Sequence, residues 1–170
     1  MLSGPLTPVQ SGSVVAGTLA ATTVLAQLHP PIPGTETFRW YQSLAKPRWT
    51  PPGAVIGAIW TGIEAGMAWG GYRLLRRPPT PARNAALGLW LFNVGMIGGW
   101  SELFFGGKKL GPAAIAAGGM LATGAAFVVA ADDVDHKAAA TGLPFVAWLA
   151  VATTLATEVW RMNRGRVAST

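Results

Sequence analysis

The stretch that decides the fold is residues 40–69, which read WYQSLAKPRWTPPGAVIGAIWTGIEAGMAW. Its first half is aromatic and cationic and ends at Pro51 and Pro52, which suit the first turn of a helix because proline lacks the N–H that is unpaired there. Its second half is an apolar run of helical length that carries Trp60, Trp69 and one carboxylate, Glu64. Indoles and an acid therefore stand where a membrane-spanning helix would ordinarily have leucine.

The composition of the 170-residue chain is typical of a membrane protein. Apolar residues make up 51% and charged residues 12%, whereas soluble domains carry about 25% charged residues. The absence of cysteine excludes disulfides and thiolate-based zinc sites, and two histidines leave little for a metal site. We therefore expect no metal and no obligatory cofactor. The net charge of +6 lies in short basic clusters beside apolar runs, which argues against nucleic-acid binding.

Five apolar stretches are long enough to cross a hydrocarbon core of about 30 Å as helices. Short links rich in proline, glycine or charge separate them, so we expect an all-α membrane protein that folds as an up-and-down bundle of five transmembrane helices. Residues 1–10 are expected to be an N-terminal tail, 11–163 the transmembrane domain and 164–170 a basic C-terminal tail. We expect a long loop over 35–52 and helices over about 11–28, 53–75, 82–105, 110–131 and 141–160.

An odd number of spans places the two termini on opposite faces of the membrane. The first long loop, the link near residues 106–109 and the C-terminus then share one face, which carries more lysine and arginine than the other. Cytoplasmic loops are enriched in these residues, so the pattern predicts an integral membrane protein with this face in the cytoplasm.

Small residues recur every four positions along the second predicted helix, at Gly62, Gly66 and Gly70. Such a ridge lets two helices approach closely. Packing within the bundle is the favoured interpretation, and a homodimer through one such face stays open.

The carboxyl group of Glu64 lies near the middle of a predicted span, where an isolated charge is costly. Either the acid is protonated and hydrogen-bonded to a neighbouring helix, or it faces a water- or ligand-filled pocket. The sequence leaves both open.

Eight tryptophans are a large excess for this length, and Trp60, Trp100 and Trp148 fall inside predicted spans. Ordinary packing explains any one of them, but together they favour a flat, polarizable cavity for an aromatic or polyene ligand. No common catalytic motif is present. His136 beside Asp133 and Asp135 suggests a weak cation site, although a solvated loop is the favoured interpretation.

Three blocks of residues follow one another along the chain. The first and most specific block contains Trp40, Tyr41, Leu44, Lys46, Pro47, Trp49, Pro51, Pro52 and Trp60-Thr61. The later blocks are Trp100-Ser101 with Phe104-Phe105-Gly106, and Leu143-Pro144-Phe145 with Trp148 leading to Asn163. In these blocks the chain resembles the TspO/MBR family of tryptophan-rich sensory proteins and translocator proteins.

The resemblance implies a five-helix bundle, often dimeric, with a pocket that opens toward the first long loop. Members of the family bind porphyrins such as protoporphyrin IX, and also sterols or benzodiazepine-type ligands, and some are reported to promote light- and oxygen-dependent porphyrin breakdown. By motif position, Trp60 and Trp148 are the candidates for that breakdown. The cavity-lining positions are Tyr41, Trp60, Trp100, Trp148 and Ala152.

The chain departs from the family pattern at four positions. Glu64 stands where the family usually has an aromatic residue, and Ile97 where it usually has asparagine. Phe145 replaces the usual tyrosine, and Ala156 replaces the usual asparagine or serine. The pocket has lost neutral polar groups and gained an acid. The expected ligand-binding residues are Tyr41, Trp60, Glu64, Ile97, Trp100, Phe145, Trp148 and Ala152.

The sequence and the resemblance together predict a porphyrin-binding sensor or regulator in a bacterial cell membrane. Its expected partners are membrane lipid, a hydrophobic ligand such as protoporphyrin IX or haem, and a second copy of the chain. Two alternatives stay open. One is a photo-oxidative porphyrin-degrading enzyme, and the other is a structural or transport-associated subunit that binds a sterol or carotenoid.

Overall fold

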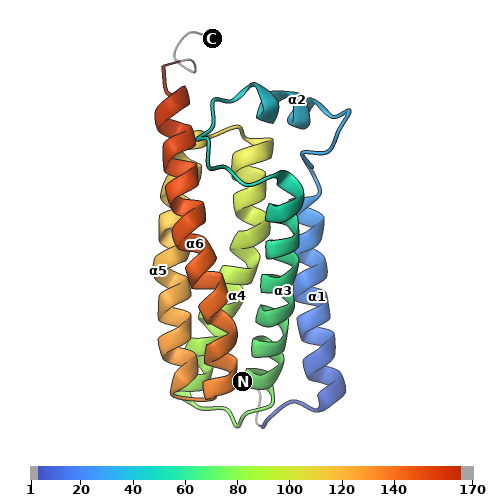
Figure 1. Cartoon of the computed structure of the whole chain (residues 1–170). Coiled ribbons are helices and arrows are strands. Elements are labelled where there is room, and N and C mark those ends of the chain that lie inside the picture. Colours follow the sequence, from blue (N-terminus) through green and yellow to red (C-terminus); the bar gives the residue numbers. More distant parts are fainter. Residues whose placement is uncertain (1–3, 166–170) are drawn as a thin grey trace.

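A computed structural model describes residues 4–165, and every regular element within them is helical. Five long helices run side by side, a short helix α2 (Glu36–Ser43) lies across one end of them, and a single π-helical turn η1 (Glu102–Gly106) extends α4 (Figure 1). The C-terminal end of α6 lies at the same end as α2. The long helices are α1 (Pro8–Ala26), α3 (Gly53–Leu75), α4 (Pro81–Ser101), α5 (Leu110–Asp132) and α6 (His136–Asn163).

The predicted bounds hold for α3 and differ most at the start of α6, while α4 ends at Ser101, where η1 continues it, and α1 starts at Pro8. Helix α1 begins inside the expected tail because Thr7 and Gln10 form a reciprocal capping box, with N···O distances of 3.0 and 3.2 Å. Helix α6 begins five residues before the expected position because Asp135 Oδ1 accepts the backbone N–H groups of Lys137 and Ala138, both at 3.0 Å.

The prediction of a continuous loop over residues 35–52 was wrong, because α2 lies within it. Thr35 Oγ1 accepts the N–H of Phe38 at 3.0 Å, and Glu36 stands in the first turn, where its charge favours the helix dipole. These capping residues are visible in the sequence, but the helix is only eight residues long and lacks an apolar stripe of helical length.

Most of the buried side chains form one core between α3, α4, α5 and α6. Trp90 of α4, only 2% exposed, donates its indole N–H to the carbonyl of Met67 at 2.7 Å. Its ring lies directly against Gly71 of α3, so that any side chain at this position would collide with it. The absence of a side chain at Gly71 therefore positions α4 against α3.

Two of the three ridge glycines serve packing within the bundle, as expected. A Cβ atom at Gly66 would lie 3.5 Å from the carbonyl oxygen of Thr141 in α6, and one at Gly70 would collide with the Thr141 hydroxyl. Gly62 faces open space. Gly66 and Gly70 thus let α3 lie directly against Thr141 of α6.

Within residues 4–165, three helices are long and apolar enough to cross a membrane by length and composition: α1, α5 and α6. Helices α3 and α4 have similar lengths of 23 and 21 residues but include polar side chains such as Glu64, Arg73, Arg83 and Asn93. Arg83 is buried and donates to the carbonyls of Leu74 and Leu75 at 3.2 Å, so it caps the end of α3.

Candidate functional site

Two tryptophans and a phenylalanine meet between α3 and α6. Trp60 lies edge-to-face against Trp148, with ring centroids 6.5 Å apart and planes at 90°. It makes a similar contact with Phe145, at 6.4 Å and 61°. Phe145 is completely buried and both indoles are half-buried. We call Trp60, Phe145 and Trp148 the α3–α6 aromatic group.

These rings lie well away from the tight glycine contact between the two helices. Gly70, where a Cβ atom would collide with the Thr141 hydroxyl, lies about 15 Å along α3 from Trp60, because a helix rises about 1.5 Å per residue. Pro144, which precedes Phe145, has no N–H to donate to the carbonyl of Ala140. Helix α6 therefore lacks one backbone hydrogen bond a turn before Trp148.

The indole N–H of Trp148 is buried and finds no acceptor within residues 4–165. A buried donor without a partner costs about 1–3 kcal/mol. Two other tryptophans of the core differ, because Trp90 donates to Met67 and Trp100 donates to the carbonyl of Ala113 at 2.8 Å. Trp90 and Trp100 thus have their polar atoms satisfied by the fold, whereas Trp148 has a free donor beside Trp60.

A second aromatic group lies where α4, η1 and α2 meet. Trp100 stacks on Phe104, with centroids 4.9 Å apart and planes at 14°, and lies edge-on to Phe105 at 6.3 Å. Tyr41 of α2 contacts the same two phenylalanines, at 6.4 and 5.8 Å. Phe104 and Phe105 therefore connect Tyr41 to Trp100. The spacing of four residues from Trp100 to Phe104 is the sequence signal for this stack.

The segment that carries Tyr41 is fastened to the end of the bundle by polar contacts. Asn163 at the end of α6 accepts the N–H of Ala45 at 3.0 Å and donates to the Ala45 carbonyl at 2.8 Å. Lys108 pairs with Glu36 of α2 at 2.6 Å. Burial raises the pKa of the Tyr41 hydroxyl, which therefore remains a hydrogen-bond donor at neutral pH. Helix α2 thus lies over the end of the bundle and packs against the second aromatic group.

Of the eight predicted ligand-binding residues, Trp60, Phe145 and Trp148 are in mutual aromatic contact, and Tyr41 and Trp100 share contacts with Phe104 and Phe105. Glu64 and Ala152 are half-buried and lie one helical turn beyond Trp60 and Trp148. Tyr41 belongs to a second cluster that shares Trp100 with the main core. Five residues belong to or pack against the main core: Trp60, Ile97, Trp100, Phe145 and Trp148.

Glu64 forms no hydrogen bond or ion pair with any described residue. The interpretation in which a neighbouring helix accepts its proton thus finds no partner in residues 4–165.

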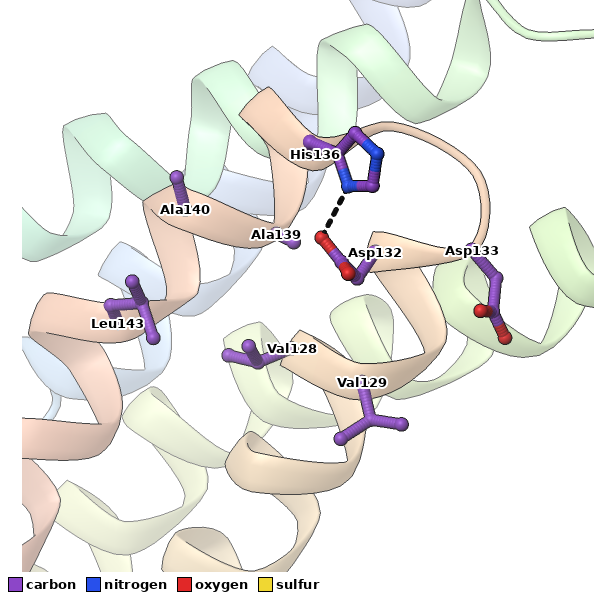
Figure 2. Close-up of a pocket in the computed structure, with 8 residues that line it drawn as sticks. All are labelled: Val128, Val129, Asp132, Asp133, His136, Ala139, Ala140 and Leu143. Carbon is purple, nitrogen blue, oxygen red and sulfur yellow. Dashed lines mark hydrogen bonds and ion pairs between the residues drawn. The ribbon is translucent and has the colours of Figure 1, made fainter.

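The hypothesis of a cation site at His136 gains no support. His136 is paired with Asp132 at 2.6 Å, and Asp133 points away from both in a shallow hollow between α5 and α6 (Figure 2). Asp135 is held by Arg73 and Arg77 instead. No group of three histidine or carboxylate side chains suited to a metal occurs in the described part of the chain.

Two hollows on the surface lie at the end of the bundle opposite α2. The first has a volume of about 480 Å³ and contains His136, and the second, of about 220 Å³, contains Trp69 and three arginines. Neither includes any of the eight predicted ligand-binding residues.

Comparison with known proteins agrees with the sequence blocks around Trp40, Trp100 and Trp148. The chain is 35% identical over 136 residues to the Translocator protein of Ovis aries, covering 77% of this chain and 79% of that relative. It is 31% identical over 134 residues to Protein CrtK of Rhodobacter capsulatus, covering 74% and 79%. It is 28% identical over 127 residues to the Tryptophan-rich sensory protein of Cereibacter sphaeroides, covering 75% and 78%.

The family profile described as the TspO/MBR family matches residues 14–161, which include α3, α4 and α5 completely, nearly all of α6 and the larger part of α1. The resemblance seen in the sequence is therefore confirmed. The chain is a membrane protein and belongs to the TspO/MBR family.

Proposed function

We propose that all five long helices cross a bacterial cell membrane and that the bundle binds a tetrapyrrole between α2, α3 and α6. Each long helix exposes at least one large apolar side chain. Ile115, for example, is 73% exposed and Leu91 54% exposed. Apolar surface on every long helix suits lipid better than water. The other exposed apolar residues that support five spans are Val24, Val55, Phe92, Val129 and Val151.

The free indole N–H of Trp148 is the observation that carries the binding proposal. A porphyrin offers a flat aromatic face to Trp60 and carboxylate or ring-edge atoms to a hydrogen-bond donor. Glu64, one turn beyond Trp60, would contact a polar edge of the ligand. Because rings from α3 and α6 are in contact, binding requires them to part, and α2 must move to admit the ligand.

Titration with protoporphyrin IX, followed by quenching of tryptophan fluorescence, tests this function. We expect saturable quenching and a loss of affinity of about tenfold in Trp148→Phe, since the ring remains but its donor is lost. Trp60→Phe combined with Trp148→Phe should weaken binding further. Trp69→Phe is the matched control because Trp69 lies on α3, far from the group and 53% exposed. Quenching that does not saturate, or an equal loss of porphyrin affinity in Trp69→Phe, would contradict the proposal.

Contact between Trp60 and Trp148 also favours a second function, light- and oxygen-dependent porphyrin degradation. Adjacent indoles 6.5 Å apart can pass an electron between them after excitation of a bound porphyrin. Illumination with and without oxygen distinguishes the two functions. With a protein that only binds, the porphyrin absorbance should decay at the same rate as for free porphyrin. Faster oxygen-dependent decay that disappears in Trp60→Phe would show that the protein degrades porphyrin.

We also propose a homodimer with the α2 end and the C-terminus in the cytoplasm. Since Gly66 and Gly70 are used inside the bundle, the dimer must use another face, and Gly62 lies on open surface. Light scattering in detergent measures the oligomer, and accessibility of a C-terminal tag in sealed vesicles measures the orientation. Co-purification with a larger pigment or transport complex would instead show a structural subunit that binds a sterol or carotenoid.

A further inference from the structure

The end of α3 opposite α2 carries a hollow of about 220 Å³ that porphyrin binding does not use. Three arginines and two aromatic residues surround it, together with one carboxylate from the start of α6. We call it the arginine hollow, and its residues are Trp69, Tyr72, Arg73, Arg76, Arg77 and Asp135.

Asp135 neutralises only part of the positive charge in the arginine hollow. Its buried carboxylate accepts Nε and Nη2 of Arg73 at 3.0 and 2.8 Å, and Nε and Nη2 of Arg77 at 2.8 and 2.5 Å. Arg76 donates Nη1 to the carbonyl of Leu6 at 3.0 Å. Three arginines against one aspartate leave a net charge of +2.

Several guanidinium donors in the hollow remain free for an anion. A guanidinium has five N–H donors. Nη1 of Arg73 and of Arg77, and Nε and Nη2 of Arg76, have no acceptor within residues 4–165. The Asp135 carboxylate holds two of the guanidinium groups in fixed orientations, which favours the fork-like contacts that arginine makes with phosphate.

The aromatic wall of the hollow indicates where that phosphate comes from. Trp69 is 53% exposed and stacks on Tyr72, with centroids 5.7 Å apart and planes at 13°. The guanidinium carbon of Arg73 lies 5.8 Å from the Trp69 ring. Exposed tryptophan and tyrosine gather at the level of lipid headgroups, and α3 ends at Leu75 directly beside them.

We propose that the arginine hollow binds the phosphate of an anionic membrane phospholipid, with Trp69 and Tyr72 against the upper part of the lipid. The proposal depends on α3 crossing the membrane and is independent of porphyrin binding. A soluble phosphate would need the arginines but not the exposed indole.

Native mass spectrometry of the full-length protein in detergent tests the site, with phosphatidylglycerol as the probe and phosphatidylcholine as the neutral comparison. We expect tighter binding of phosphatidylglycerol, and a loss of about fivefold in Arg76→Gln, since one arginine near an anionic surface contributes about that factor. Trp69→Ala should also weaken binding. Arg48→Gln is the matched control, because Arg48 is exposed on the α2 side of the bundle.

Equal affinity for the two lipids would overturn the proposal. So would equal losses in Arg76→Gln and Arg48→Gln, since these would show diffuse attraction to the whole basic protein. Inorganic phosphate at millimolar concentration should leave the bound phosphatidylglycerol in place. Displacement by phosphate, together with full binding by Trp69→Ala, would assign the hollow to a soluble anion and refute a lipid site.

Discussion

Replacing Asp135 by asparagine should strongly destabilise the bundle. Its carboxylate is 2% exposed and joins α3 to the start of α6 through Arg73 and Arg77. Although burial by itself raises the pKa of Asp135, hydrogen bonds from both arginines outweigh that effect and lower the pKa to about 2. The ordinary pKa of aspartate is about 3.9, so the ionised form contributes roughly 2–3 kcal/mol to the free energy of unfolding.

The pH dependence follows from the direction of this shift. Because the pKa of Asp135 is depressed in the folded state, its contribution is fully present above about pH 4 and is lost as the pH falls toward 2. In Asp135→Asn the contribution should be missing at every pH. The asparagine can still cap α6, so the expected loss comes from the contacts with the two arginines.

Thermal unfolding in detergent, followed by circular dichroism, measures both effects. A loss of 2–3 kcal/mol should lower the melting temperature by roughly 5–10 °C at pH 7 for a chain of this length. Asp133→Asn is the control, because Asp133 is exposed in the same turn and has no hydrogen-bond partner among the described residues. An unchanged melting temperature in Asp135→Asn, or an equal decrease in the control, would refute the reasoning.

Two further substitutions test the packing of α3 and the attachment of α2. Gly71→Ala should destabilise the protein by about 1–3 kcal/mol, because its methyl group meets the buried ring of Trp90, whereas Gly62→Ala faces open space and should be neutral or slightly stabilising in the same melting assay. Asn163→Ala removes two hydrogen bonds to Ala45 and should increase deuterium exchange in α2. Arg161→Gln is the control, and equally slow exchange in the two variants would contradict this role of Asn163.

The long helices could be predicted from the sequence because each apolar run, as a helix, is long enough to cross a membrane. The links between the runs contain proline, glycine or charged residues. The sequence predicted α3 best, since Pro52 and the arginines after Leu75 mark both ends. It failed where a few capping hydrogen bonds decide the structure. Thr7 lengthens α1, Asp135 lengthens α6, and Thr35 starts a short helix in a segment without helical periodicity.

The sequence could also predict which aromatic residues share the core, but not which of them are free to bind. Trp90, Trp100 and Trp148 all lie inside long helices and have the same chemistry. They differ only in whether a backbone carbonyl from another turn or helix lies within reach of the indole N–H. That depends on how α3, α4, α5 and α6 pack against one another, which residue types and spacing alone do not determine.

The contacts between α3 and α6 explain why the two ends of this interface suit different tasks. At one end, Asp135 bridges α6 to Arg73 and Arg77, and Gly70 lies directly against Thr141, so relative movement there would break buried ionic and backbone contacts. At the other end, the helices meet through the rings of Trp60 and Trp148, which can rotate without breaking a hydrogen bond made by Trp148. If the proposed ligand parts the helices at the end that carries Trp60 and Trp148, Asp135 would hold the opposite end of the interface together. Asp135→Asn should then change the porphyrin affinity measured by tryptophan quenching, and an unchanged affinity would contradict this coupling.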